Sequence, residues 1–303
     1  MKQNYGLVDG KLQVLENGVF SFLKRPTKAE IGVFSKKFDF PFDYIGGILD
    51  DYENARFEVD KNGTILLLLQ FPAPSDVSEI ETYPYSLILT ADGHVIFSLN
   101  HEIALARLTE SKFDEKKVTH QLIFRVIELL TAEFQTYLHE FRETRHAVAK
   151  SIEKSTKNDQ LLQLIRIQSS LVYFQDALTN NLGVLTEFSE YLKENGQDGF
   201  SERIEDLIVE TDQAQTDSRI QEKLLENLRD LFSNIVANNL NIVMKIMTSA
   251  TFVLGIPAVI VGFYGMNVPI PNQTDKNMIW IIIFVILTLS GLVSWWLKKR
   301  DMM

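Results

Sequence analysis

The sequence predicts an α-helical membrane protein with an α/β domain at its amino-terminal end and two spanning helices at its carboxyl-terminal end. Three observations lead to this prediction. Two apolar runs of roughly 20 residues, 246–264 and 278–297, contain no acidic or basic side chain. Between Pro84 and Pro257 the chain holds no other proline, which favours long helices. The segments before residue 110 instead combine strand-forming residues with turn residues.

Residues 1–110 have the pattern of a mixed α/β domain. Asp92-Gly93 and Lys61-Asn62-Gly63 are typical hairpin turns. Thr27 and Glu30 have the spacing of a capping box, which predicts a helix through about Lys36, and another helix is expected over 41–49. Strands rich in branched and aromatic residues are expected at 18–23, 56–59, 64–71, 85–90 and 94–98.

Residues 111–245 are predicted to be a helical region that includes a stalk helix. Helices are expected over about 116–154 and 159–193, and from about residue 202 onward, with glycines near residue 196 marking the last turn. The last helix is predicted to continue unbroken into the first apolar run. At 1.5 Å per residue it would extend on the order of 95 Å from Glu202 to Tyr264.

The apolar runs are predicted to be transmembrane helices joined by an external loop, 265–277, and followed by a basic tail, 298–303. Tryptophans lie near both ends of the second run, where amphipathic rings suit the membrane interface, although core packing explains them as well. Positive residues flank the two runs and are scarce in the loop, so both termini are expected on the cytoplasmic side of the cell membrane.

Charge and composition narrow the function. The formal net charge is −10, and the acidic excess precedes residue 246. An acidic body argues against nucleic-acid binding and is compatible with attraction of cations, although solubility alone also favours it. Cysteine is absent, and we find no motif of a phosphate-binding loop, a zinc protease or a nucleophile, so no enzyme is expected. His139, Glu143 and His146 share a helix face as possible metal ligands, but an exposed amphipathic surface is the favoured interpretation.

One face of the first apolar run is suited to line a hydrated path. Two helices cannot enclose such a path, so several copies would have to surround a central axis. Small residues at this spacing also occur where membrane helices pack closely, and the periodicity alone leaves both interpretations open. The positions that recur at spacings of three and four are Asn241, Met244, Met247 or Thr248, Thr251, Gly255, Ala258 and Gly262.

The segment Tyr264-Gly265-Met266-Asn267 lies where the first apolar run ends. Here the sequence resembles the CorA-type magnesium transporter family, whose Gly-Met-Asn signature lies between its two carboxyl-terminal helices. Residues 238–248 and 50–59 are similar to the family's entry into the first span and to its cytoplasmic domain. The resemblance covers nearly the whole chain. It implies a homopentameric channel in a lipid bilayer for Mg²⁺, with Co²⁺, Ni²⁺ or Zn²⁺ as further ions.

Gly265, Met266 and Asn267 form the selectivity filter that this resemblance implies. Mg²⁺ gives up its water reluctantly, so neutral oxygens of the Asn267 amide and of the helix end can bind the hydrated ion through its waters. Gly265 is expected to take the left-handed conformation at the turn. The alternative is that Asn267 only caps the helix.

The resemblance further implies a gate. Met244 and Met247 would form an apolar constriction, Asn241 a polar ring just below it, and Asp230 an acidic ring in the stalk. Ordinary core filling is the alternative for the methionines. Ala258 departs from the hydroxyl-bearing residue seen in the family, and the loop segment 272–276 has a single acid beside a lysine, which weakens the case for a cation-concentrating outer loop.

A regulatory Mg²⁺ site is expected at Asp206, with Asp76 or Glu79 facing it across a subunit boundary. Carboxylates gathered there repel one another until a cation bridges them, so bound Mg²⁺ would hold the pore closed. An exposed helix acid without a bridge is the alternative. Two other functions remain open, a ZntB-like zinc transporter, possibly proton-coupled, and a membrane-anchored sensor or scaffold that conducts nothing.

Overall fold

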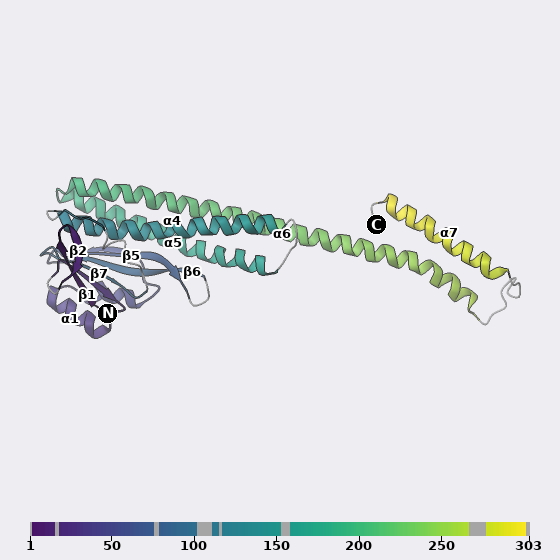
Figure 1. Cartoon of the computed structure of the whole chain (residues 1–303), viewed down its shortest axis with the longest axis horizontal. Helices are drawn as coiled ribbons and strands as arrows, with labels where there is room; N and C mark the ends of the chain where they lie inside the picture. The colour runs from purple at the N-terminus through teal and green to yellow at the C-terminus, as the bar shows by residue number, and fades with distance from the viewer. Residues whose placement is uncertain are drawn as a thin grey trace. The chain divides into compact units, whose positions relative to one another are not determined.

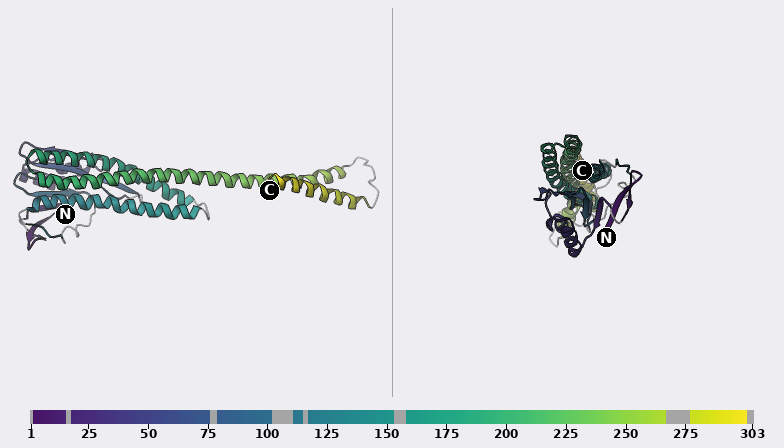
Figure 2. Two further views of the ribbon diagram at one scale, coloured as in Figure 1. Left: turned by 90° about the horizontal axis from the view of Figure 1, so that it is seen from above. Right: turned by 90° about the vertical axis from the view of Figure 1, so that its left-hand side faces the viewer.

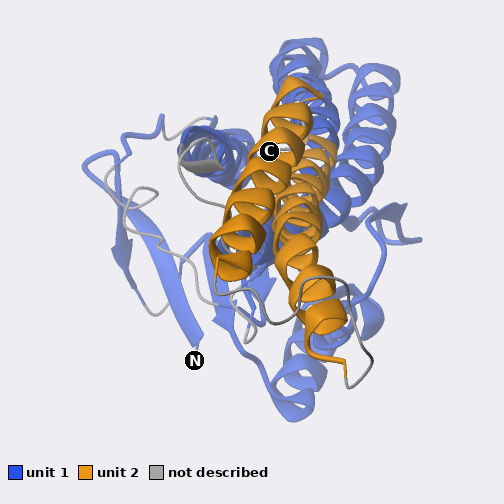
Figure 3. Ribbon diagram, turned by 90° about the vertical axis from the view of Figure 1, so that its right-hand side faces the viewer, with its two compact units in different colours: residues 1–229 blue, residues 230–303 orange. Residues whose placement is uncertain are grey.

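The computed structural model describes residues 2–15, 18–75, 79–101, 111–114, 117–152, 158–266 and 277–300. The chain forms two compact units, residues 1–229 and residues 230–303, which are blue and orange in Figure 3. Helix α6 (Asp198–Tyr264) begins in the first unit and ends in the second, where it is followed by α7 (Met278–Lys299). The predicted fold class, an α/β body with a long helix leading to two apolar helices, is confirmed.

A sheet forms the middle layer of the first unit, and within the described residues it has seven strands in the order β2-β1-β3-β7-β6-β5-β4. Strands β3 and β7 pair in parallel, and every other neighbouring pair is antiparallel. The strands are β1 (Lys2–Val8), β2 (Lys11–Val14), β3 (Phe20–Lys24), β4 (Arg56–Val59), β5 (Ile65–Pro74), β6 (Ile80–Leu89) and β7 (Val95–Leu99). Strands β1 and β2 were not predicted from the sequence.

Alternate residues of the central strands face two separate cores, because successive side chains of a strand point to opposite sides. Leu67 and Leu69 of β5 pack toward the long helices α4 (Val118–Ile152), α5 (Asn158–Glu194) and α6. Leu66 and Leu68 face the short helices α1 (Lys28–Phe38), α2 (Asp43–Gly46) and η1 (Gly47–Leu49). Figure 1 shows the sheet between these two helical layers. Burial on both sides explains the apolar run Ile65–Leu69 at the start of β5.

Local backbone signals confirm several predicted boundaries. The Glu30 amide donates to Thr27 Oγ1 at 3.2 Å and the Thr27 amide donates to Glu30 Oε2 at 2.8 Å, which completes the capping box of α1. Gly63 and Gly93 adopt φ angles of 79° and 84° in the two hairpin turns. Gly196, with a φ angle of 69°, lies in the turn between α5 and α6. Helix α6 begins soon after it, at Asp198, four residues earlier than the sequence predicts.

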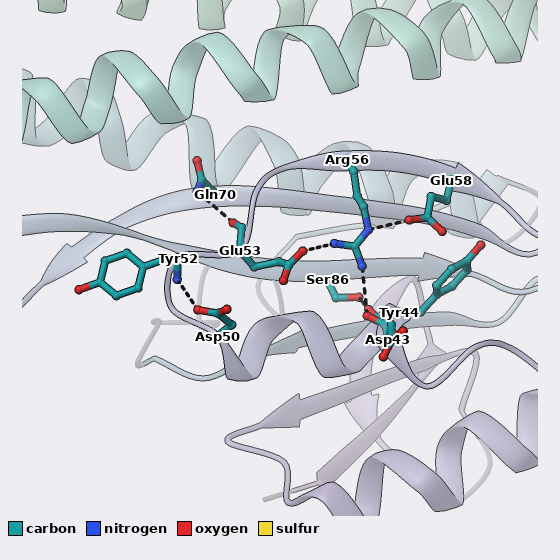
Figure 4. Close-up of polar contacts among 9 residues, drawn as sticks. All are labelled: Asp43, Tyr44, Asp50, Tyr52, Glu53, Arg56, Glu58, Gln70 and Ser86. Carbon is teal, nitrogen blue, oxygen red and sulfur yellow. Dashed lines mark hydrogen bonds and ion pairs between the residues drawn. The ribbon is translucent and has the colours of Figure 1, made fainter.

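Arg56 ties the loop after η1 to the edge of the sheet (Figure 4). Its Nε donates to Glu58 Oε1 at 2.6 Å, Nη1 pairs with Glu53, and Nη2 lies 3.4 Å from the carbonyl oxygen of Asp43. The Glu53 carbonyl in turn accepts a 3.2 Å hydrogen bond from Gln70 Nε2 on β5. These contacts occupy much of segment 50–59, one of the stretches that resembles the magnesium transporters, and they give it a structural role.

Asn181 of α5 replaces a missing strand neighbour of β5. Strand β4 pairs with β5 only as far as Leu68, which leaves the backbone of Gln70 without a strand partner on that side. The side chain of Asn181 accepts from the Gln70 amide at 2.9 Å and donates to the Gln70 carbonyl at 2.7 Å. Both groups are buried, so this pair of bonds satisfies backbone atoms that would otherwise be desolvated without partners.

The three long helices run side by side in the first unit (Figure 2), and their mutual contacts change character along α6. Its first turns place Phe200, Ile204 and Leu207 in the core beneath the sheet. Farther along, Gln215 Nε2 donates to Thr179 Oγ1 at 2.6 Å and Gln221 Nε2 donates to the Leu138 carbonyl at 2.7 Å. We call the buried polar residues of α6 in this unit the polar seam; they are Ser201, Thr211, Gln215, Ser218 and Gln221.

Candidate functional site

The second unit contains the two apolar helices predicted from the sequence. The end of α6 and the whole of α7 are long and apolar enough to cross a membrane. Only 6% of the apolar window of α6 and none of that of α7 is buried within the chain, whereas the apolar side chains of a soluble core helix would be covered. These helices therefore present apolar surfaces that require lipid or other chains as neighbours.

The predicted pore-lining positions are uncovered along α6. Met244 and Met247 are 57% and 66% exposed, and Asn241, Thr251, Ala258 and Gly262 are exposed as well, while Gly255 is partly covered. A Cβ atom added at Gly255 or Gly262 would meet no atom within 4 Å. This face is thus free, within the described residues of one chain, to contact further copies.

A cavity of about 640 Å³ lies beside this face, between the end of α6 and Leu289 of α7. Thr251 and Gly255 belong both to the predicted pore face and to the cavity. The Thr251 hydroxyl donates to the Met247 carbonyl at 2.8 Å, so its hydrogen atom is used within the helix. Apolar side chains such as Phe252 and Ile256 dominate the remaining wall, which does not provide the oxygen ligands of a cation site.

The end of α6 differs from the expectation in one respect. Gly265 does not adopt the left-handed conformation that the sequence analysis assigned to it. Its amide still donates to the Val261 carbonyl at 2.9 Å, and the Met266 amide donates to Phe263 at 3.3 Å, so helical hydrogen bonding continues past Tyr264. A Cβ at this position would lie 3.2 Å from the Val261 oxygen, so a side chain here would require a shift of a few tenths of an ångström.

The other members of the predicted filter are placed only in part. Met266 is exposed at the end of α6, with 49% of its surface accessible. Asn267 lies outside the described residues, as does the loop segment 272–276. The filter assignment therefore stays a prediction from sequence.

Asp206, the predicted regulatory residue, is exposed on α6 near Glu210, a carboxylate that the sequence analysis did not single out. Burial raises the pKa of Glu210, and the charges of Glu128 on α4 and of Asp206 raise it further. Glu128 is in turn paired with Arg125. The spacing of four between Asp206 and Glu210 is visible in the sequence, whereas the approach of Glu128 depends on how α4 packs against α6.

Of the two expected partners of Asp206, the structure describes only Glu79, and the contacts of that segment lie on α5. Asp76 lies outside the described residues. Glu79 precedes β6, where the Ile80 amide donates to Ser170 Oγ of α5 at 3.0 Å. Its charge contributes, after burial and the charges of Glu81 and Tyr52, to the raised pKa of Tyr173 on α5. A pairing of Asp206 with Glu79 would therefore have to form between copies of the chain.

Two further expectations concern acidic and histidine side chains. Asp230 is exposed on α6. A residue that lines a path between several copies would also be exposed when one chain is considered alone. His139, Glu143 and His146 are also exposed on α4, consistent with the favoured interpretation of an amphipathic surface. Within the ranges that the structure describes, no three His, Asp or Glu side chains lie close enough to hold a metal ion.

A long helix that joins an α/β body to two apolar helices defines a class of membrane proteins with two spans per chain. The chain belongs to the family of CorA-like Mg²⁺ transporter proteins, whose family model matches residues 18–299. Among curated proteins, it is 22% identical over 265 residues to the cobalt/magnesium transport protein CorA of Methanocaldococcus jannaschii, covering 85% of this chain and 82% of that protein.

Solved structures show the same fold. The complete structure of the CorA magnesium transporter from M. jannaschii matches with a TM-score of 0.84 at 18% identity, covering 100% of this chain and 98% of that one. The full-length CmaX protein matches with a TM-score of 0.75 at 14% identity, over 98% and 96% of the two chains. The ZntB cytoplasmic domain from Vibrio parahaemolyticus matches with a TM-score of 0.61 at 11% identity, covering 78% of this chain and 98% of that domain.

Proposed function

We propose that this chain is one subunit of a homopentameric channel that carries Mg²⁺ into the cell, with both termini on the cytoplasmic side of the cytoplasmic membrane. The observation that carries the proposal is the uncovered face of α6 from Asn241 to Gly262, in a chain that belongs to the CorA-like Mg²⁺ transporter family. The name of the relative from M. jannaschii supports Mg²⁺ and Co²⁺ as transported ions.

In this proposal the ion enters at the end of α6. The carbonyl groups of a helix end carry partial negative charge, which favours a cation arriving there. Gly265, Met266 and Asn267 would present neutral oxygens to the water shell of Mg²⁺ rather than strip it. The membrane potential supplies roughly 4.6 kcal/mol per 100 mV for a divalent ion, twice the value for a single charge, so conduction requires no enzymatic step.

Farther along α6, the proposal places the gate at Met244 and Met247. Rings of thioether side chains narrow a path without offering a ligand that replaces water, and a hydrated ion is excluded when such a constriction loses its water. Asn241 would add a polar ring and Asp230 an acidic ring, which attract the cation once the constriction is wet.

Regulation would use the carboxylates around Asp206. Asp206 would supply one carboxylate of the kind that Mg²⁺ prefers, and since no three acidic side chains within the described ranges of one chain lie close enough to hold the ion, a neighbouring copy would have to supply further ligands. Nearby, burial and the charges of Glu128 and Asp206 raise the pKa of Glu210, so negative charge is unfavourable there. In this proposal, Asp76 or Glu79 of a neighbouring copy completes the site. Occupied sites would hold the subunits together and the gate closed.

The test is ion flux into proteoliposomes that contain the full-length protein, with Mg²⁺, Co²⁺, Ni²⁺ and Zn²⁺ supplied singly. Mg²⁺ influx that rises with an inside-negative potential is expected. Asn267→Ala should abolish this influx, while Asn272→Ala, in the same segment, should preserve it. Zn²⁺ influx that needs a proton gradient, without Mg²⁺ influx, would replace the proposal by the ZntB-like alternative. If correctly assembled protein carries no ion flux, the proposal is replaced by the alternative of a membrane-anchored sensor or scaffold that conducts nothing.

A further inference from the structure

A cavity of about 410 Å³ on the first unit collects positive charge in an otherwise acidic chain. Its volume falls within the range of about 300–1,000 Å³ that is common for small-molecule sites. Among the described residues of its wall, Lys112, Arg125 and Arg203 contribute cationic groups and Glu128 contributes a carboxylate. Ser111, Phe113, Gln121 and Phe124 also line it.

Arg203 packs its guanidinium against an aromatic ring of α4. Its guanidinium carbon lies 4.0 Å from the centre of the Phe124 ring, a cation–π contact that covers the ring face. A guanidinium bound in this way still has its N–H groups at the edge of its plane. No carboxylate among the described residues pairs with Arg203 or with Lys112. Both cations therefore remain available to an anion.

One neutral side chain, Gln121, and one further guanidinium, that of Arg125, lie in the same wall. Gln121 Oε1 accepts from the Asp114 amide at 2.8 Å, which fixes the side chain and leaves its Nε2 group as a donor. Arg125 Nε lies 3.3 Å from Ser111 Oγ, while its Nη1 pairs with Glu128. The cavity thus offers guanidinium, ammonium and amide donors together, the combination that binds phosphate oxygens.

A second cavity, of about 340 Å³, adjoins the first because both are lined by Gln121 and Arg203. It adds Lys117 and His120, with Asp198 as its carboxylate. The His120 ring stacks on Phe200 with 4.3 Å between ring centres and 6° between planes, so its position is fixed by packing. Lys117 extends the positive region into the second cavity, whereas burial and the Lys117 charge lower the pKa of His120 and disfavour its charged form.

We propose that these adjoining cavities bind a small anion that carries two or more phosphate groups. Arg203 lies at their shared boundary and would contact a bridging part of the phosphate chain, with Lys112 and Arg125 at one end and Lys117 at the other. This site is separate from the pore face and from the Gly-Met-Asn segment. It therefore does not rest on the proposed transport function and can fail or succeed independently of it.

Calorimetric titration of the full-length protein in detergent, in buffer free of divalent cations, tests the proposal. The probes are sodium tripolyphosphate, ATP and inorganic phosphate. Saturable binding of tripolyphosphate, at least about tenfold tighter than that of inorganic phosphate, is expected because more charge-assisted bonds form. Additional binding of ATP would support the same site with a nucleotide as the source of the phosphate chain. No saturable binding of tripolyphosphate or ATP up to millimolar concentration would overturn the proposal.

Variants locate the binding. Arg203→Ala and Lys112→Ala should each weaken tripolyphosphate binding by at least about fivefold, and Arg203→Lys should weaken it less than Arg203→Ala because the charge is kept. Arg219→Ala removes an exposed arginine on the same helix outside both cavities and should leave the affinity unchanged.

Lys112 is exposed, so its replacement does not disturb the core and remains informative if Arg203→Ala fails to fold. Unchanged affinity in Lys112→Ala, or an equal loss in Arg219→Ala, would show that the phosphate chain binds elsewhere or only through general charge.

Discussion

Gly265 lies so close to the preceding turn of α6 that a methyl group has little room. Gly265→Ala would place a Cβ at 3.2 Å from the Val261 carbonyl oxygen and would displace the backbone that leads into the predicted filter. We expect Mg²⁺ uptake to fall by at least about tenfold, because channel selectivity depends on the placement of carbonyl oxygens. Uptake by cells and chain assembly would be measured together.

The matched control for this change is Gly291→Ala on α7, where an added Cβ meets no atom within 4 Å. This variant should transport like the parent protein. Normal uptake in an assembled Gly265→Ala protein would show that the backbone at this position is not part of the ion path.

Met247→Gly tests the apolar constriction. Removing the thioether chain should wet the narrow segment and raise Mg²⁺ flux several-fold at high internal Mg²⁺. Ile246→Gly is the control, because a glycine there destabilises the helix by about the same 1 kcal/mol. Ile246 lies about 100° around the helix axis from Met247. Equal flux increases in both variants would indicate a general loosening of α6 instead of an opened gate.

Glu210→Gln tests the carboxylate cluster through its pH dependence. Because the folded-state pKa of Glu210 is raised, its contribution to stability is present below the unfolded pKa and is lost as pH rises through the folded pKa. The melting temperature of the variant should therefore be higher than that of the parent protein at pH 8, and the two should be equal at pH 4. Partial exposure limits the gain to at most about 0.5 kcal/mol, or about 1–2 °C.

Thermal melting of the full-length protein without Mg²⁺ would measure this difference, with Glu226→Gln, an exposed glutamate of α6, as the control. A lower melting temperature for Glu210→Gln at pH 8 would mean that the carboxylate makes a favourable contact and that the cluster is not under repulsion.

At the scale of elements, the bond pair between Asn181 and Gln70 anchors α5 to the sheet. Asn181→Ala would leave a buried amide and a buried carbonyl without partners, at a cost of about 2–4 kcal/mol. Asn180→Ala, on the exposed side of the same turn, should cost less than about 0.5 kcal/mol. Urea unfolding followed by circular dichroism compares the two, and similar midpoints would contradict the structural role of Asn181.

The long helices could be predicted because no proline lies between Pro84 and Pro257 and glycine is scarce there, and such signals are local. Helix α7 begins at the predicted residue, and α4 and α5 end within a few residues of expectation. Strands β1 and β2 were missed because they form an edge hairpin with many exposed polar positions, such as Lys2 and Lys11. The pairing of β1 with β3 and of β2 with β1 stabilises these strands, and such tertiary contacts cannot be seen in the composition of the two segments.

Some parts of the candidate site could likewise be predicted from local sequence signals, whereas others depend on tertiary contacts. The face of α6 follows from helical periodicity, and the family motif at residues 265–267 is contiguous in sequence. Glu128, by contrast, reaches the carboxylates of α6 only through tertiary packing, and the Asn181 bonds join residues 111 positions apart. Contacts between residues so distant in the sequence cannot be predicted from the spacing of residue types.

For the whole molecule, the absence of cysteine provides a clean test of assembly. Met247→Cys should be joined between subunits by a short bis-maleimide in native membranes, because a residue at the axis approaches its own copies. Ile246→Cys, 54% exposed but turned away from the predicted axis, should react poorly. Gel electrophoresis would show dimer bands for Met247→Cys alone, and the reverse pattern would require α6 to face the axis differently.

The polar seam has a further consequence for how the first unit opens under native conditions. Amide hydrogens of α6 near Ile204 are covered by the apolar core and should exchange with deuterium only during global unfolding. Around Gln215 and Gln221, part of the buried contact consists of hydrogen bonds to side chains and carbonyls, for which water can substitute. We therefore expect the amide hydrogens of this section of α6 to exchange faster than those near Ile204 when hydrogen exchange is measured on the folded protein.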